Sequence, residues 1–320
     1  MKVISNPTQD EIKNAANALK DGHLVAFPTE TVYGLGADAT NEKAVNRIYS
    51  VKNRPTYHPL IVHISSINLL HKWAIDIPEY AIKLAKEFWP GPMTLILKRS
   101  NLAKDFITGG QGNVGIRVPV NPIALALLSE FEKLNGLGIA APSANRFGGV
   151  SSTTAEAVMD ELAIFLDKKD LILDGGQSLI GVESSIIDCT ATTPVVLRPG
   201  AVTENMIKSR INLPAIFDTN NSQVKASGLL DSHYSPKAKV VLNVTPKPGE
   251  GFIAMADIPT PNGAIRLASP ANIKEFSHVL YSSLRKADKA NISVVSVTLP
   301  ESGGLGDAII DRLNRAKSRW

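Results

Sequence analysis

Short runs of apolar residues alternate with amphipathic stretches along most of the chain. The runs have the length of buried strands and are bounded by turn-forming residues; they lie at 25–27, 60–64, 93–97, 114–118, 138–141, 171–173, 184–188 and 194–197. Residues 8–20 predict an amphipathic helix, because apolar residues from Ile12 to Leu19 recur at helical spacing and Thr8 with Glu11 can form a capping box. Strands that alternate with helices, together with a closing hairpin, predict a mixed α/β sheet.

The apolar periodicity fails between Leu213 and Lys239 and then resumes. Asn, Ser, Pro and Gly dominate the interruption, which is typical of a linker. Beyond it, strands are expected near 239–243, 251–255, 263–267 and 292–298, and helices near 271–288 and 306–317. We therefore expect a first domain at 1–212, a linker at 213–238 and a smaller Rossmann-like α/β domain at 239–320.

Polar side chains stand at the end of the first apolar strand. Thr29, Glu30 and Thr31 follow residues 25–27, and a helix that begins near Asn41 ends at Lys52 and Arg54. In open α/β sheets ligands usually bind at the carboxyl ends of the strands. An ammonium and a guanidinium facing hydroxyls and a carboxylate suit an anionic, phosphate-bearing substrate. Residues 25–64 therefore predict an enzyme site.

Each of these residues also has a plainer interpretation. Lys52 and Arg54 taken alone are more often a solvated helix end. His63 lies inside an apolar run, where a histidine is usually a satisfied core residue but can also point its ring into a cleft. Ser143 and Asn145 follow a buried strand, and they suit either plain turn chemistry or contacts to phosphate and ribose oxygens.

The same arrangement recurs further along the chain. Arg117 lies inside the strand 114–118 and needs an anionic partner, which either an acidic residue or a ligand can supply. Glu183, Ser184 and Arg198 again place polar groups at strand ends. In all, six places in the predicted α/β domain carry polar residues at or within a strand, and so many favour a binding site over coincidence.

Glycine patterns do not indicate a common nucleotide fold. Residues 34–39 match G-x-G-x-x-A, but a proline-led polar turn separates them from the preceding strand, so no dinucleotide turn is expected. The chain has no G-x-x-x-x-G-K-[ST] loop. A nucleotide site in this protein would have to be built without a Walker loop.

Composition narrows the classes of protein to which this chain can belong. A chain of 320 residues is too long for one ordinary hydrophobic core, which indicates two domains. Its content of 44% hydrophobic and 20% charged residues is typical of soluble globular proteins. The net charge of +4 permits polyanionic ligands without indicating a nucleic-acid binder. The single Cys189 excludes an internal disulfide and a multi-cysteine metal site. No run has the length of a membrane span or a signal peptide, so we expect a cytoplasmic protein.

Taken together, the motifs resemble the YrdC-like family of threonylcarbamoyl-AMP synthases, in its long form with an additional C-terminal domain. The resemblance rests on FPTETVYGLGADA (27–39), KNRP (52–55), PLIVHI (59–64), WPGPMTLIL (89–97), VGIRVP (114–119), APSAN (141–145), GGQSLIGVESSIID (175–188) and LRPGAV (197–202), with HYSP (233–236) in the linker marking the long form. It covers residues 1–210 densely, and residues 239–320 only in length and βα pattern. It implies a YrdC-like twisted mixed sheet with helices, followed by the smaller Rossmann-like domain.

The resemblance also implies an activity. Members join L-threonine, CO2 or bicarbonate, and ATP into threonylcarbamoyl-AMP, with Mg2+ and with release of pyrophosphate. ATP is then a substrate and Mg2+ the expected cofactor, although the sequence names no metal ligand. The product would pass to a separate transferase that modifies the adenosine next to the tRNA anticodon, which requires no stable binding of RNA by this chain and no membrane.

The family's site residues fall on twelve positions of this sequence. Those expected to act in catalysis, by holding the triphosphate and the carbamate, are Lys52, Arg54, Ser143 and Asn145. Those expected to hold L-threonine, with Arg117 as the carboxylate clamp, are Thr31, His63, Arg117 and Ser184. Further contacts to ATP are expected from His58, Ser151, Arg198 and Tyr234. His58 departs from the expected asparagine and by itself would be a surface residue. The linker would act as a lid that excludes water from the adenylate.

Two alternatives compete with this assignment. A double-stranded-RNA-binding module could use a basic concave sheet to hold an A-form helix. The mild charge and the scarcity of Lys and Arg clusters in residues 1–210 argue against it. A carbamoyl-adenylate former of the hydrogenase-maturation type would carry an additional zinc-finger module, and this chain has no cysteine pairs for one.

Overall fold

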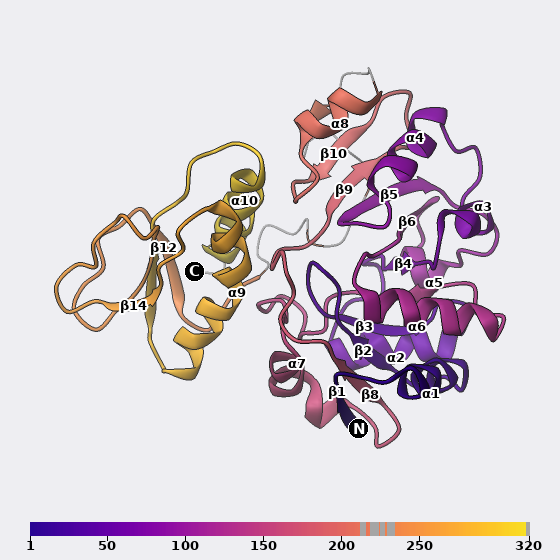
Figure 1. Cartoon of the computed structure of the whole chain (residues 1–320), viewed down its shortest axis with the longest axis horizontal. Helices are drawn as coiled ribbons and strands as arrows, with labels where there is room; N and C mark the ends of the chain where they lie inside the picture. The colour runs from indigo at the N-terminus through magenta and orange to yellow at the C-terminus, as the bar shows by residue number, and fades with distance from the viewer. Residues whose placement is uncertain (212–215, 218–223, 225–227, 229–233, 318–320) are drawn as a thin grey trace.

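The computed structural model describes residues 1–211, 216–217, 224, 228 and 234–317, and it arranges them around a large and a small sheet (Figure 1). The large sheet has the order β1 (Lys2–Ser5), β8 (Leu171–Asp174), β2 (Val25–Phe27), β3 (Gly34–Asp38), β7 (Ile139–Ala140), β4 (Ile61–His63), β6 (Asn113–Arg117), β5 (Met93–Lys98), β9 (Ser185–Asp188), β10 (Val195–Arg198) and β11 (Ile216–Phe217). β4 runs parallel to β6 and β2 antiparallel to β3. The predicted mixed α/β sheet is confirmed.

Helices cover both faces of the large sheet. They are α1 (Gln9–Lys20), α2 (Glu42–Lys52), α3 (Leu70–Trp73), α4 (Glu79–Phe88), α5 (Asp105–Thr108), α6 (Pro122–Lys133), α7 (Ala155–Leu162) and α8 (Glu204–Ile211), with 3-10 turns at Ile67–Leu69 and Ala163–Phe165. Val25 and Phe27 of β2 pack in one apolar cluster with Leu127 of α6, whereas Ala26 packs in another with Ile48 of α2. Because successive strand side chains point to opposite faces, α6 and α2 cover opposite sides of the sheet.

The strand β3 departs from the sequence expectation of a polar turn leading to a helix. It pairs antiparallel with β2, so residues 28–33 form the turn of a hairpin that carries Thr29 to Thr31. Its glycines conceal the strand because they have low strand propensity. Gly36 is required there, since a Cβ atom would lie 2.7 Å from a methyl group of Ile139 and 2.8 Å from the ring of Phe27.

The small sheet is parallel and has the order β12 (Lys239–Leu242), β15 (Val294–Val297), β13 (Gly251–Ile253) and β14 (Ile265–Ala268). Helices α9 (Ile273–Lys289) and α10 (Leu305–Lys317) lie between this sheet and the first domain (Figure 1). α9 begins after Asn272, whose side chain accepts a hydrogen bond from the N–H of Glu275. A smaller α/β domain with a parallel sheet is therefore confirmed.

The two domains share an apolar cluster. Val32, Val150 and Val182 of the first domain are buried together with Phe276 and Leu280 of α9. The linker expected at 213–238, including His233 of its HYSP motif, lies outside the described residues except for 216–217, 224, 228 and 234–238. The exact domain limits stay a prediction. In the described part of the chain, no helix has the length and apolarity needed to cross a membrane.

Candidate active site

A polar pocket lies where the β2–β3 turn meets the ends of β4 and β6. Its lining consists of Thr29, Thr31, Val32, Tyr33, Gly34, Ile61, His63, Arg117, Ala141, Pro142, Ser143, Glu183, Ser184, Arg198 and Tyr234. Strand pairing creates this convergence, because β4 and β6 place His63 opposite Arg117 and Gly34 forms a bridge with Ser143. Seven of the twelve candidate residues therefore meet in one pocket, from segments far apart in the sequence.

Arg117 has its anionic partner inside the protein. One Nη atom donates to Glu30 Oε1 at 2.6 Å, the other to Thr31 Oγ1 at 2.9 Å, and Nε donates to the carbonyl of Gly91 at 3.2 Å. Arg117 and Glu30 are both buried. A guanidinium has five N–H groups, so two remain for a ligand carboxylate. The ion pair fixes the guanidinium at the pocket wall, and the role of Arg117 as a clamp stays a prediction.

His63 is a neutral imidazole beside that guanidinium. Its side chain is 4% exposed, and burial together with the charge of Arg117 lowers its pKa to about 3. Phe27 packs edge-on against the ring at 5.9 Å. Among the described residues, Nδ1 of His63 has no hydrogen-bond partner. A buried ring nitrogen without a partner at a pocket wall is available to a polar group of a ligand.

Lys52 supports the pocket from behind. Its Nζ donates to the carbonyl of Ser143 at 2.6 Å and also to the carbonyl of Asn145, and the residue is 1% exposed. Asn53 makes this placement possible, because its left-handed conformation (φ 52°) ends α2. Burial and the charge of Arg54 lower the pKa of Lys52 well below its usual value. A solvated helix end is therefore the wrong interpretation, and Lys52 fixes the strand-end loop that carries Ser143.

Arg54 belongs to the same buried support. It is 6% exposed, donates to the carbonyl of Pro59 at 2.9 Å and lies over the ring of Phe147 at 5.4 Å. Burial lowers its pKa to about 10. His58 packs against the same Phe147 ring at 5.1 Å and is buried, so the expectation of a surface residue is wrong. Arg54 and His58 do not line the polar pocket.

The loop of residues 143–152 carries three further candidates. Asn145 donates to the carbonyls of Arg146 at 2.7 Å and Gly149 at 2.9 Å, and its Oδ1 has no partner within the described ranges. Ser151 donates to Oε1 of Glu183 at 2.5 Å. Asn145 and Ser151 are buried next to the pocket rather than in its lining, whereas Ser143 lines it.

Ser184, Arg198 and Tyr234 also belong to the lining of the pocket. The Ser184 hydroxyl is hydrogen-bonded to that of Thr94 at 2.8 Å, and Arg198 donates to the Ser184 carbonyl at 3.0 Å and its hydroxyl at 3.2 Å. Burial lowers the pKa of Arg198. Tyr234 is buried and stacks on Tyr281 of α9 with ring centroids 5.8 Å apart. The first domain and the segment before the second domain thus build one wall together.

Two acidic residues of the site have roles that the sequence does not predict. Glu30 holds Arg117, and Glu183 lines the pocket and holds Ser151. The sequence places both glutamates next to predicted strands, in TET (29–31) and VES (182–184), but it does not indicate which side chain each glutamate binds. No group of three or more His, Cys, Asp or Glu among the described residues could hold a metal ion.

Comparisons with known proteins identify the family of the chain. A family model described as "Telomere recombination" matches residues 17–200, and one described as "Threonylcarbamoyl-AMP synthase, C-terminal domain" matches residues 202–318. The threonylcarbamoyl-AMP synthase of Pyrococcus abyssi is 39% identical over 96% of this chain and 94% of its own. The synthase of Bacillus subtilis is 36% identical over 96% and 92%.

Solved structures of similar proteins superpose on this chain. Pyrococcus abyssi Sua5, crystallised in complex with L-threonine, superposes with a TM-score of 0.88 at 36% identity and covers 99% of this chain and 97% of its own. Escherichia coli YciO superposes on 62% of this chain with 94% of its own length, at 27% identity and a TM-score of 0.52. One similar protein therefore has both domains, and another has the length of the first domain alone.

Proposed function

The chain belongs to the YrdC-like threonylcarbamoyl-AMP synthase family in its two-domain form, and from that premise we propose that the polar pocket is where it joins L-threonine to AMP. The chain is accordingly a nucleotidyltransferase that synthesises threonylcarbamoyl-AMP from L-threonine and ATP, in the service of tRNA processing. The observation that carries the assignment of the site is the meeting of Arg117, His63, Ser143 and Ser184 in one buried pocket.

We assign the Arg117 side of the pocket to L-threonine. The two unused N–H groups of Arg117 suit the amino acid's carboxylate, and Glu30 and Thr31 keep the guanidinium in place. His63 adds a neutral polar atom that does not repel the substrate's ammonium group. Ser184 supplies a further hydroxyl in the lining of the pocket. A buried, pre-formed set of donors of this kind favours one small polar ligand over many.

We assign the loop 143–152 and the cations behind it to ATP and the carbamate. Burial and their mutual repulsion lower the pKa of Lys52, and burial lowers that of Arg54, so a bound anion would stabilise both charges. The proposed ATP contacts are Lys52, Arg54, His58, Ser143, Ser151, Arg198 and Tyr234, and Asn145 completes the catalytic set. Mg2+ would enter with the triphosphate, since Mg2+ is commonly bound through substrate phosphates and few protein ligands.

The proposed chemistry has two steps. The ammonium group of L-threonine first loses a proton, and the free amine then adds to CO2 with loss of a second proton, or condenses with bicarbonate with loss of water, to give a carbamate. A carbamate oxygen then attacks the α-phosphorus of ATP, and pyrophosphate leaves. Both reactants of the second step are anions, so the site must offset their repulsion and fix their geometry, which is the work of fixed cations and hydroxyls in a dry pocket. A separate tRNA-modifying transferase would consume the product, and we place the reaction in the cytoplasm.

The test is product analysis with the purified protein. ATP, Mg2+ and bicarbonate are incubated with L-threonine, L-serine or L-valine, and the nucleotide product is weighed by mass spectrometry while pyrophosphate is counted. We expect an adduct of AMP and carbamoyl-threonine that needs both bicarbonate and L-threonine. A nucleotide pool unchanged by L-threonine, beside RNA affinity that falls steeply with salt, would instead favour the RNA-binding alternative.

A further inference from the structure

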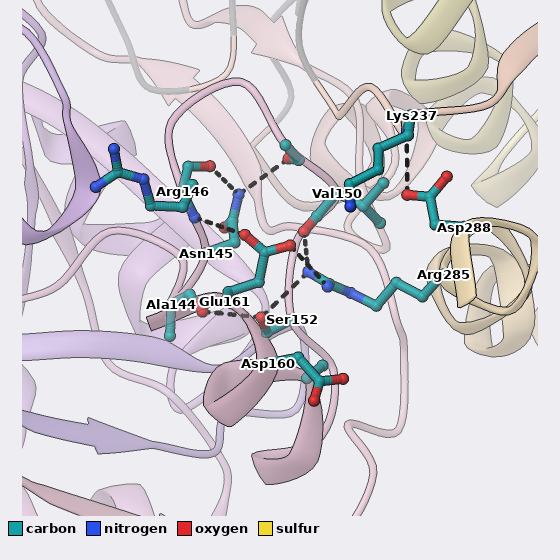
Figure 2. A network of polar contacts seen from close by, with 12 residues as sticks. Ala144, Asn145, Arg146, Val150, Ser152, Asp160, Glu161, Lys237, Arg285 and Asp288 are labelled. Carbon is teal, nitrogen blue, oxygen red and sulfur yellow. Dashed lines mark hydrogen bonds and ion pairs between the residues drawn. The ribbon is translucent and has the colours of Figure 1, made fainter. Parts of the chain in front are cut away.

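Two arginines of the second domain bind the first domain in the same way. Arg285 of α9 pairs with Glu161 at 2.9 Å and donates to the carbonyl of Val150 (Figure 2). Arg312 of α10 pairs with Glu183 at 3.0 Å and donates to the carbonyl of Pro199 at 2.9 Å. Each arginine therefore joins a glutamate and a main-chain carbonyl of a segment that forms the active site.

Arg312 fixes the wall that carries Glu183. Besides Nε, it uses Nη2 to donate to the main-chain carbonyl of Glu183 at 3.3 Å. Tyr281 of α9 donates to the same carboxylate oxygen at 2.8 Å, while Ser151 donates to the other one. Burial alone would raise the pKa of Glu183, but Arg312 and Arg198 outweigh it and lower that pKa. The carboxylate is thus held in one orientation, next to Ser184.

Arg285 fixes the loop 143–152. It donates to Ser152 Oγ at 3.3 Å, and this hydroxyl in turn donates to the carbonyl of Ala144 at 2.8 Å. Glu161, its ion-pair partner, accepts from the N–H of Arg146 at 3.2 Å (Figure 2). The loop is therefore held by the second domain on one side, and by Lys52 through the carbonyls of residues 143 and 145 on the other.

Apolar contacts also hold the two domains together. The apolar cluster that joins Val32, Val150 and Val182 to α9 already buries surface between them. A buried ion pair is costly to desolvate and often adds no more stability than apolar residues of the same volume. Arg312 and Glu183 are both almost fully buried. We therefore expect the pair to contribute a defined orientation of the two side chains more than it contributes stability.

We propose that the second domain shapes the active site, with Arg285, Arg312 and Tyr281 as positioning residues that hold the loop 143–152 and the segment 183–184 in the arrangement that binds L-threonine and ATP. The three side chains are absent from the lining of the polar pocket and act through Ser151, Glu183 and main-chain carbonyls. The proposal rests on the proposed function, since it concerns the binding of those substrates.

The experiment compares variants of the full chain. Tyr281→Phe removes one hydroxyl and keeps the ring stacked on Tyr234, while Arg285→Gln and Arg312→Gln remove the two charges. Arg266→Gln is the matched control, because the hydrogen bonds of Arg266 all end inside the second domain. For each variant the unfolding temperature, the Kd for L-threonine and for ATP, and kcat and KM are measured.

We expect KM and Kd to rise about tenfold for Arg285→Gln and Arg312→Gln and roughly threefold for Tyr281→Phe, the loss expected when a hydrogen bond that orients a site group disappears. Arg285→Lys should retain part of the affinity that Arg285→Gln loses, and Arg266→Gln should leave it within about twofold of the wild type. If Arg312→Gln does not fold, the affinities of Tyr281→Phe and Arg285→Gln test the proposal without it.

Wild-type affinities in folded Tyr281→Phe and Arg285→Gln would overturn the proposal. An equal loss of affinity in Arg266→Gln would overturn it too, because general destabilisation of the second domain would then be the cause. A wild-type protein that makes no threonylcarbamoyl-AMP would instead contradict the proposed function, and the Kd values for ATP would still compare the variants.

Discussion

His63 should make the first domain lose stability in mild acid. Its pKa is about 3 in the folded protein against 6.5 in the unfolded chain. Between these values the unfolded chain binds a proton that the folded protein does not, so the free energy of unfolding falls as the pH drops below 6.5. At about 1.4 kcal/mol per pH unit, the loss caused by His63 alone reaches about 2 kcal/mol at pH 5.

The assay is urea unfolding at pH 7 and pH 5 for the wild type and for His63→Gln. Trp73 and Trp89 report on the first domain, and a Trp320→Phe background removes the third tryptophan of the chain. The change in unfolding free energy between the two pH values should be smaller in His63→Gln by about 2 kcal/mol. Any constant effect of the substitution cancels in this difference.

Equal pH dependence in both proteins would refute the reasoning, because His63 would then titrate alike in the folded and unfolded states.

The low pKa of His63 also has a consequence for the kinetics. His63 should stay neutral across the working pH range, so the pH profile of kcat/KM should show no step from this residue.

Three further predictions concern other parts of the site. Lys52→Ala should lower turnover by about 10²–10³, the usual cost of one preorganised charge donor, and pyrophosphate release at the wild-type rate would remove Lys52 from the mechanism. Glu30→Gln should cost about 3–5 kcal/mol of stability, because it leaves Arg117 buried without its charged partner; an unchanged urea midpoint would contradict this. Truncation near residue 225 should leave a folded first domain with poor activity, and full activity would exclude the role of the linker as a lid.

Local patterns were sufficient to predict much of the fold. The capping box at Thr8 and Glu11 is present, and α1 begins at Gln9 as expected. Strand β2 occupies the predicted residues 25–27. The sequence does not predict β3, because Gly36 of this strand is required by close packing against Ile139 and Phe27. Such a tertiary constraint leaves no periodic pattern of apolar residues in the sequence.

The candidate site likewise has a part that the sequence predicts and a part that it does not. The convergence of Arg117, His63 and Ser143 could be predicted, because sheets bring strand ends together. The position of Lys52 behind the pocket could not, since it depends on the direction in which one long side chain leaves its helix. Arg285 and Arg312 gave no signal at all, because their partners lie more than 100 residues away in another domain.

Those distant partners limit how the two halves of the protein can be exchanged. A hybrid that grafts the second domain of a relative onto residues 1–211 would inherit the site only if it also kept both matched pairs, Glu161 with Arg285 and Glu183 with Arg312. A graft chosen for its apolar contacts alone would join the two domains but leave Glu161 and Glu183 without their arginine partners, close to the loop 143–152. Compatibility between the two domains therefore depends on matched polar pairs as well as on matched apolar surfaces.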